Sequence, residues 1–199
     1  MKLKMIALLV FSVATIFAQG NLFKGGKFET GNDVLAWQPG HWVHIGPALG
    51  DYKKLLPIMS PFCQRQLVLD AKSGRWSIKV ATDKATHKIK DNKGGIILVS
   101  NSLNQTVNVA PGKYKMSVWV KGKFEKLPGY NALRLFISCT KKDKKVVSLL
   151  DHQFKITNSW VLFEKELNVP ANGSALVFRF ALYGVGEIQL DDATLVKIN

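Results

Sequence analysis

The chain has 199 residues, of which 47% are hydrophobic and 21% are charged, and this composition excludes the strong polar bias of a disordered chain. Its 28 Lys and Arg residues against 14 Asp and Glu residues give a net charge of +14, which favours anionic partners without naming one. A chain of this length can bury enough surface to fold as one domain without a dense disulfide framework, and it contains only two cysteines.

Residues 1–18 have the pattern of a cleaved signal peptide. Lys2 and Lys4 precede an apolar run over residues 5–17, and a small residue follows the run. An uncleaved membrane anchor is the alternative, but the run is shorter than the roughly 20 apolar residues that span a bilayer. We therefore expect a signal peptide at 1–18, a single domain at 19–199, and a secreted or periplasmic location.

The remainder of the chain alternates apolar and polar residues with the period of a half-buried strand. In the clearest run, Tyr114, Met116, Val118 and Val120 alternate with Lys113, Lys115, Ser117, Trp119 and Lys121. The same alternation occurs in residues 76–80, 133–137 and 176–182, with turn signals rich in Gly, Pro and Asn between the runs. This pattern predicts an all-β fold, an antiparallel two-sheet β-sandwich, with a long loop at 45–65.

Four segments follow one another in an order typical of a known group of domains. They are residues 21–29 followed by Trp37, residues 73–80, residues 111–121 and residues 188–195. With these segments the chain resembles the jelly-roll carbohydrate-binding modules attached to xylanases and cellulases, within the galactose-binding-domain-like fold. The resemblance covers nearly the whole mature chain, and it implies the jelly-roll fold more directly than any particular ligand.

Three carboxylates lie where this resemblance implies a structural calcium ion. Glu29 follows the first segment, while Asp191 and Asp192 end the last one, and a sandwich whose ends pair would gather them at one edge. The modules that the chain resembles often hold calcium there through carboxylates and backbone carbonyls, here those near Ser73 and Gly74. The alternative is that Glu29 accepts backbone N–H bonds in a turn and that the Asp pair is a solvated strand end.

The resemblance also implies a glycan-binding site on a concave outer sheet face. In such modules aromatic rings stack on sugars and polar side chains bind hydroxyls. The residues expected to provide these groups are Trp119, Phe136, Arg134, Arg179, Gln189 and the loop residue Trp42. An Arg there could also bind a uronate or sulfate. The alternative is that a loop, 45–65 or 122–130, covers Trp119 and Phe136 so that they form a second hydrophobic cluster.

At one place the sequence differs from the pattern of these modules. Many of these modules have a large aromatic residue where this chain has Gly94 and Gly95, so this aromatic platform is missing, and altered or lost binding is an alternative to retained binding. Trp42 and Tyr130 could take its place at the rim of the site. Trp37 and Trp160 are expected in the core or at an edge.

An enzyme is the second class to weigh, and the sequence offers few catalytic candidates. It has no Gly-x-Ser-x-Gly or His-Glu-x-x-His motif, and no acid lies at metal-ligand spacing from His41 and His44. We therefore expect a secreted, non-catalytic protein that binds a poly- or oligosaccharide, acidic glycans included. The sequence leaves two alternatives for how it acts, alone or beside a partner glycoside hydrolase. We expect neither nucleic-acid binding nor a membrane span. A secreted or adhesion protein-interaction domain of the same fold is the alternative, followed by a polysaccharide-degrading jelly roll.

The two cysteines leave two states open. Cys63 lies in the proline-rich loop, and Cys139 lies at the end of a strand on its core-facing side. The pair could form one disulfide in an exported protein, or Cys139 could be a buried free thiol.

Overall fold

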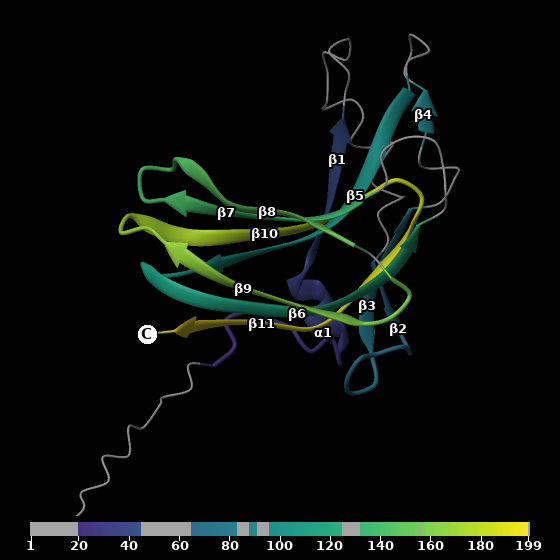
Figure 1. Cartoon of the computed structure of the whole chain (residues 1–199), viewed down its shortest axis with the longest axis horizontal. Coiled ribbons are helices and arrows are strands. Elements are labelled where there is room, and N and C mark those ends of the chain that lie inside the picture. Colours follow the sequence, from purple (N-terminus) through teal and green to yellow (C-terminus); the bar gives the residue numbers. More distant parts are fainter. Residues whose placement is uncertain are drawn as a thin grey trace, which may run out of the picture.

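The computed structural model describes residues 20–44, 65–82, 88–90, 96–124, 132–155 and 157–198. These residues form two antiparallel sheets that face each other across a shared core, with one short helix at the edge (Figure 1). The expected antiparallel two-sheet β-sandwich is therefore confirmed. Several sequence expectations fall outside the described residues, namely the signal peptide at 1–18, nearly all of the loop at 45–65, Cys63, Gly94, Gly95 and Tyr130.

The described elements comprise one helix and eleven strands. They are α1 (Gly31–Ala36), β1 (Gln38–His44), β2 (Arg65–Val68), β3 (Ser77–Thr82), β4 (Lys88–Lys90), β5 (Ile96–Asn108), β6 (Gly112–Phe124), β7 (Ala132–Lys141), β8 (Val146–Phe154), β9 (Val161–Val169), β10 (Gly173–Tyr183) and β11 (Gly186–Ile198). One sheet has the order β1-β5-β10-β7-β8, with β4 also paired to β5, and the other has the order β2-β3-β11-β6-β9. No helix in the described part of the chain is long and apolar enough to cross a membrane.

The alternation read from the sequence decides which side of each strand faces the core. In β6 the residues Tyr114, Met116, Val118 and Val120 are buried, while their neighbours Lys115, Ser117, Trp119 and Lys121 are only half-buried. In β7 and β10 the same parity buries Leu135 and Phe180 and turns Arg134 and Arg179 outward. Each fully buried large apolar side chain contributes about 1.5–3 kcal/mol, so reversing this parity would be costly.

An aromatic cluster closes one end of the core. Trp37 is fully buried, and its ring centroid lies 5.2 Å from that of Phe23 and 5.6 Å from that of Phe28. Of the two places expected for Trp37, the structure selects the core. The segment before it is held by Asn21, whose side chain accepts the backbone N–H of Leu195 at 2.9 Å. The beginning of the described chain therefore pairs with β11, as the sequence suggested for the two ends of the domain.

Two local features differ from the sequence expectations. Helix α1 begins with a capping box in which Thr30 and Asp33 exchange hydrogen bonds. The strand alternation did not predict this helix. Trp42 was expected in a loop, but it lies in β1, paired opposite Ser100 of β5. The long strand β5 provides a pairing partner that overrides the turn signal of Pro39 and Gly40, and β1 is an edge strand, where a proline is tolerated.

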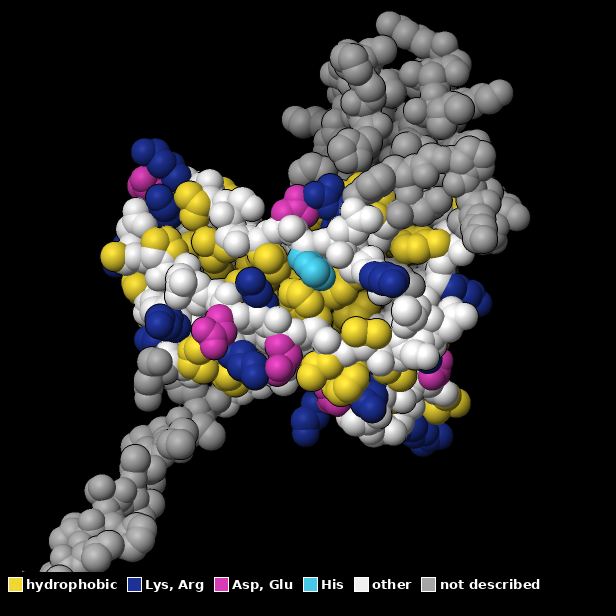
Figure 2. Space-filling view, in the orientation of Figure 1, with side chains coloured by type: hydrophobic (Ala, Val, Ile, Leu, Met, Phe, Trp, Pro, Cys, Tyr) yellow, Lys and Arg dark blue, Asp and Glu magenta, His cyan; other side chains and the backbone are white. Residues whose placement is uncertain are grey.

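On the face of the molecule shown in Figure 2, charged and hydrophobic side chains are mixed. Figure 2 shows Lys and Arg side chains in several separate places around a central band of hydrophobic side chains. This band follows the gap between the two layers, where the edge strands β8 and β9 leave a groove of about 350 Å³ lined in part by His152, Phe154 and Phe163. Cys139 is a buried free thiol whose Sγ lies 3.6 Å from the carbonyl oxygen of Thr140. Of the two states that the sequence left open for Cys139, the structure therefore has the buried free thiol.

Candidate functional site

The structure divides the expected glycan-binding residues between two opposite faces. Arg134 and Phe136 of β7 and Arg179 of β10 lie on the outer side of one sheet, whereas Trp119 of β6 and Gln189 of β11 lie on the outer side of the other. The expectation of one site containing all of them was wrong. Alternation shows which side of a strand is outward, but it does not show to which sheet the strand belongs.

The arginine face, defined by Arg134, Phe136, Arg179 and Tyr183, is the larger of the two candidate sites. Four outward side chains form a row across four neighbouring strands, in the order Asn104, Arg179, Phe136 and Asp151. Directly opposed residues in an antiparallel pair have Cβ atoms about 4.5–5.5 Å apart, so this row is continuous. The pairing of β5, β10, β7 and β8 thus assembles residues that are distant in sequence.

Hydrogen bonds fix the orientation of both arginines. Arg134 forms a two-pronged ion pair with Asp151, in which its Nε donates to Oδ1 at 3.0 Å and its Nη2 donates to Oδ2. Its guanidinium carbon also lies 4.9 Å from the ring centroid of Phe136. Arg179 donates from Nε to Oδ1 of Asn104 at 3.2 Å. An arginine held at two points loses little further freedom when a ligand binds.

These side chains surround an open pocket of about 350 Å³. Its lining combines apolar and polar groups, namely Arg134, Phe136, Ile137, Ser138, Ser148, Arg179 and Tyr183. Aromatic rings with nearby guanidinium and hydroxyl groups can stack on an apolar surface and bind hydroxyl or acidic oxygens at its edge. Tyr183 and Ser148 were missed as site residues, although the outward parity of Tyr183 was available from the sequence.

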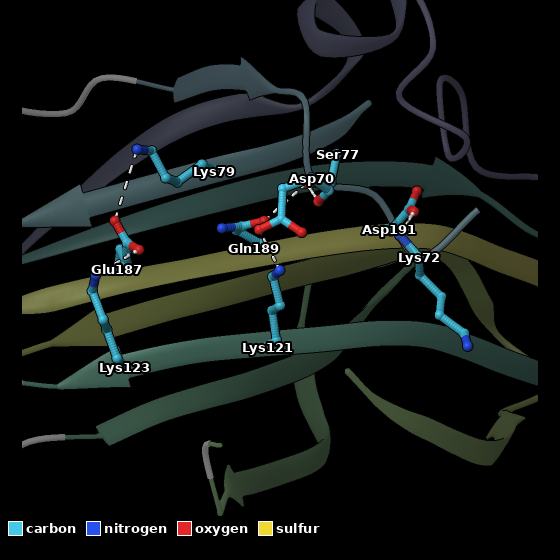
Figure 3. Close-up of polar contacts among 9 residues, drawn as sticks. All are labelled: Asp70, Lys72, Ser77, Lys79, Lys121, Lys123, Glu187, Gln189 and Asp191. Atoms are coloured by element: carbon cyan, nitrogen blue, oxygen red, sulfur yellow. Dashed lines mark hydrogen bonds and ion pairs between the residues drawn. The ribbon is translucent and has the colours of Figure 1, made fainter. Parts of the chain in front are cut away.

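The lysine face, defined by Asp70, Lys121, Glu187 and Gln189, lies on the outer side of the other sheet. Lys121 forms an ion pair with Asp70, and Glu187 lies between Lys79 at 3.7 Å and Lys123 at 3.3 Å (Figure 3). The hydrogen bond from Lys121 lowers the pKa of Asp70, against a smaller opposing effect of burial. These residues line a pocket of about 220 Å³ with Gly122 and Asn158.

The loops 45–65 and 122–130, which were the alternative cover for Trp119, lie mostly outside the described residues, so this alternative stays open. Lys72, in the turn between β2 and β3, places its Nζ 4.4 Å from the centroid of the Trp119 ring. Trp119 stays half-buried, so the ring is neither in the core nor fully free. Trp160 lies in a similar relation to Lys121, with 4.8 Å between the Nζ and the ring centroid.

Trp42 belongs to the same sheet as the arginine face, because β1 pairs with β5. The described structure places its backbone but not its side chain, and the same holds for His41 and His44. Its role as a glycan contact therefore stays a prediction.

The three carboxylates expected at a calcium site converge on one turn, between Lys72 and Trp76. Asp191 accepts N–H bonds from Lys72 at 2.7 Å and Ser73 at 3.0 Å. Glu29 accepts the N–H of Arg75 at 2.9 Å, which matches the alternative that the sequence left open for this residue. Ser73 Oγ donates to Asp192 at 2.6 Å.

The groups that face these carboxylates are N–H and O–H hydrogen-bond donors. Such groups stabilise a turn, whereas a calcium site needs oxygen atoms that face the ion. Desolvation raises the pKa of Asp191, and its N–H bonds from Ser73, Asp192 and Lys72 work in the opposite direction. Within the described ranges no group of three or more His, Cys, Asp and Glu side chains is placed to hold a metal ion. Calcium binding stays a prediction.

Comparisons with known proteins support the fold. No protein-family model and no curated protein matches the chain. The chain is similar in structure to the carbohydrate-binding module TmCBM61 in complex with β-1,4-galactotriose, at a TM-score of 0.54 and 16% identity, over 90% of this chain and 99% of that one. It is also similar to a family 16 carbohydrate-binding module, at a TM-score of 0.54 and 17% identity, over 89% and 100% of the two chains.

A third similar structure is the enzymatically active domain of bacteriophage CBA120 tailspike protein 4, at a TM-score of 0.61 and 12% identity. The match covers 89% of this chain but 21% of that one, so the present chain corresponds to about a fifth of the tailspike structure. At these identities the comparisons establish the two-sheet β-sandwich of carbohydrate-binding modules, and function has to be argued from the site.

Proposed function

We propose that the chain is a non-catalytic carbohydrate-binding protein whose glycan lies across the arginine face. One observation carries this proposal: Arg134, Phe136, Arg179 and Tyr183 come together around an open pocket of about 350 Å³. Stacking on Phe136 would provide affinity, and the fixed guanidinium of Arg179 would orient hydroxyl or acidic groups. Similarity to TmCBM61 and the family 16 module over nearly their whole length supports a binding role.

The test is affinity electrophoresis in gels that contain xylan, β-1,4-galactan or polygalacturonate. We expect at least one polysaccharide to retard the chain, and we expect Phe136→Ala and Arg179→Ala to weaken retardation at least tenfold, which corresponds to about 1.4 kcal/mol. Thr106→Ala is the matched control, because this exposed residue lies on the same sheet face outside the pocket. Retardation that none of these variants changes would remove the arginine face as the site.

Three further measurements separate the open alternatives. Retardation that falls steeply between low and moderate salt indicates an acidic glycan, because exposed charges are screened over about 8–10 Å at these salt concentrations. New reducing ends or unsaturated products in the presence of the purified chain would contradict the non-catalytic proposal. Binding to a protein partner in the absence of any glycan retardation would favour the interaction domain.

We also propose that the chain is exported after cleavage near residue 18 and that it acts beside a partner glycoside hydrolase. The basic residues Lys2 and Lys4, followed by the apolar run over 5–17, support export. N-terminal sequencing of the exported chain should begin near Gln19. Addition of the chain to a hydrolase acting on the retained polysaccharide should raise the rate of product release, and Phe136→Ala should remove this increase.

Structural calcium is a further proposal, supported by the convergence of Glu29, Asp191 and Asp192 on one turn. An ion there would have to replace N–H donors that these carboxylates already bind. If it does, the melting temperature rises with calcium, falls with chelator and loses this response in Glu29→Gln, because a ligand of the folded state stabilises it. A melting temperature indifferent to calcium would leave N–H binding as the sole role of these carboxylates.

A further inference from the structure

The lysine face carries a polar pocket that the proposed function does not use. The pocket is lined by Asp70, Lys121, Gly122, Lys123, Asn158, Glu187 and Gln189, and it has a volume of about 220 Å³. Its residues come from β6, β11, the β2–β3 connection and the β8–β9 connection, which joins the two sheets. It therefore opens on the opposite side of the sandwich from the arginine face.

Hydrogen bonds to a buried serine fix the polar groups at the floor of this pocket. Gln189 is 8% exposed and sits between Lys79 of β3 and Lys121 of β6 in the strand register. Its Oε1 accepts a hydrogen bond at 3.2 Å from Ser77 Oγ, a fully buried hydroxyl that also donates to the carbonyl oxygen of Asp70. The pocket floor is thus a fixed amide and not a mobile surface side chain.

The charges around the pocket are already paired with one another. Figure 3 shows Lys121 reaching towards Asp70 and Gln189, and Glu187 placed between Lys79 and Lys123. The Lys121 side chain is only 12% exposed, so its ammonium group is largely committed to this network. An anionic ligand would have to compete with Asp70 and Glu187 for the lysines, which disfavours a phosphate, a sulfate or a uronate here.

A neutral ligand rich in hydroxyl groups matches this arrangement. Carboxylate and amide oxygens accept hydrogen bonds, while ammonium and amide N–H groups donate them, and a sugar hydroxyl can do both. An aromatic ring lies beside one of the lining residues: the ring centroid of Trp160, which is not itself part of the lining, is 4.8 Å from the Lys121 Nζ. Stacking on such a ring with hydrogen bonds at its edge is a favourable combination for a sugar.

We propose that the lysine face is a second, independent saccharide-binding site, selective for neutral sugars. The proposal takes its ligand class from the proposed function, but it rests on different residues and on a different sheet. A chain with sites on both outer faces would bind two glycan strands at once and link them. Linked sites raise the effective affinity for a polymer without any new contact.

The test is an NMR titration of the intact chain with three neutral probes: β-1,4-galactotriose, xylotriose and cellotriose. We expect one of them to shift the indole N–H of Trp160 and the Gln189 amide, separately from the residues of the arginine face. The double variant Asp70→Ala/Asn158→Ala removes two exposed pocket residues, and it should weaken the lysine-face shifts at least tenfold. Glu164→Ala, an exposed residue of the same sheet that pairs with Lys115 outside the pocket, is the control.

The outcomes separate this inference from the proposed function. Loss of all shifts in Phe136→Ala would overturn the second site and leave the first. Loss of all shifts in the double variant alone, with Phe136→Ala inert, would overturn the first site and leave the second. If no probe shifts the lysine face of a folded wild-type chain, the second site does not exist, whatever the arginine face does. Beads coated with the bound glycan should be cross-linked by the wild type and by neither variant.

Discussion

The two outer faces of the sandwich use similar residue types for different purposes. On the arginine face the guanidinium groups hydrogen-bond to neighbouring strands, Arg134 to Asp151 and Arg179 to Asn104. On the lysine face the ammonium groups form two separate sets of ion pairs, Lys121 with Asp70, and Lys79 and Lys123 with Glu187 (Figure 3). The comparison teaches that the net charge of the chain says little about the ligand of either face, because cations on both faces are already ion-paired within the protein.

The largest expected effect tests whether the arginine face is a surface at all. Leu135→Ala should lower the free energy of unfolding by about 2–5 kcal/mol, because Leu135 is fully buried between the sheets. Its neighbour Phe136→Ala should cost about 1 kcal/mol or less, since surface substitutions usually have small effects. Urea unfolding of both variants measures the difference. Equal losses would mean that Phe136 belongs to the core.

The next largest effect is expected from a substitution in the β2–β3 turn, which should affect the lysine face and not the arginine face. Gly74 has φ +65°, and a Cβ there would collide with the Glu29 carboxylate, so Gly74→Ala should cost about 1–3 kcal/mol. Because this turn also carries Lys72 and follows Asp70, sugar shifts on the lysine face should weaken while those on the arginine face persist. Ser73→Ala, which loses only the hydrogen bond to Asp192, is the milder comparison. A Gly74→Ala chain with unchanged melting temperature would contradict the geometry of this turn.

A smaller effect should sharpen the role of the guanidinium pair. Arg134→Lys keeps the charge but cannot form the two-pronged contact with Asp151, so glycan affinity on the arginine face should fall several-fold, or about 1 kcal/mol. Lys165→Arg, at an exposed residue of β9 in the other sheet, controls for exchange of the two cations. Full affinity in Arg134→Lys, measured by the same gel retardation, would show that charge alone is sufficient.

The smallest effect concerns pH on the lysine face. Lys121 lowers the pKa of Asp70, so the folded state holds this proton more weakly than the unfolded state. The stability from the pair is therefore fully present above the unfolded pKa of about 3.9, and it is lost as the pH falls through the lowered pKa. Asp70 is 53% exposed, so the contribution should stay within about 1 kcal/mol. Melting curves of Asp70→Asn should differ from the wild type at pH 7 and coincide with it near pH 2.

The sequence predicted most of the sandwich because strand alternation is a local property. The core-facing positions from Tyr114 to Val120 and from Leu133 to Ile137 followed from the alternation of residues along each strand. The site could not follow in the same way, because Arg179 meets Phe136 only through the pairing of β10 with β7. Trp119 was grouped with these residues for lack of that pairing.

The expected calcium site also shows what the sequence could and could not predict. Sequence order correctly suggested that Glu29 and Asp191 converge, since the two ends of the domain pair. It did not reveal that the backbone N–H groups of Lys72, Ser73 and Arg75 point at them. Backbone donors carry no signature in the amino-acid sequence, so a carboxylate that caps a turn and one that binds an ion look alike before folding.

The strand order has a consequence for how the chain folds. The last two strands, β10 and β11, each lie in the middle of a sheet, with β10 between β5 and β7 and β11 between β3 and β6. Neither layer can close until residues 173–198 are available, so the earlier strands keep open edges during synthesis. Such distant pairings favour slow folding, on a timescale of about milliseconds to seconds. A nascent chain truncated before β10 would have both sheets split and would be prone to aggregate.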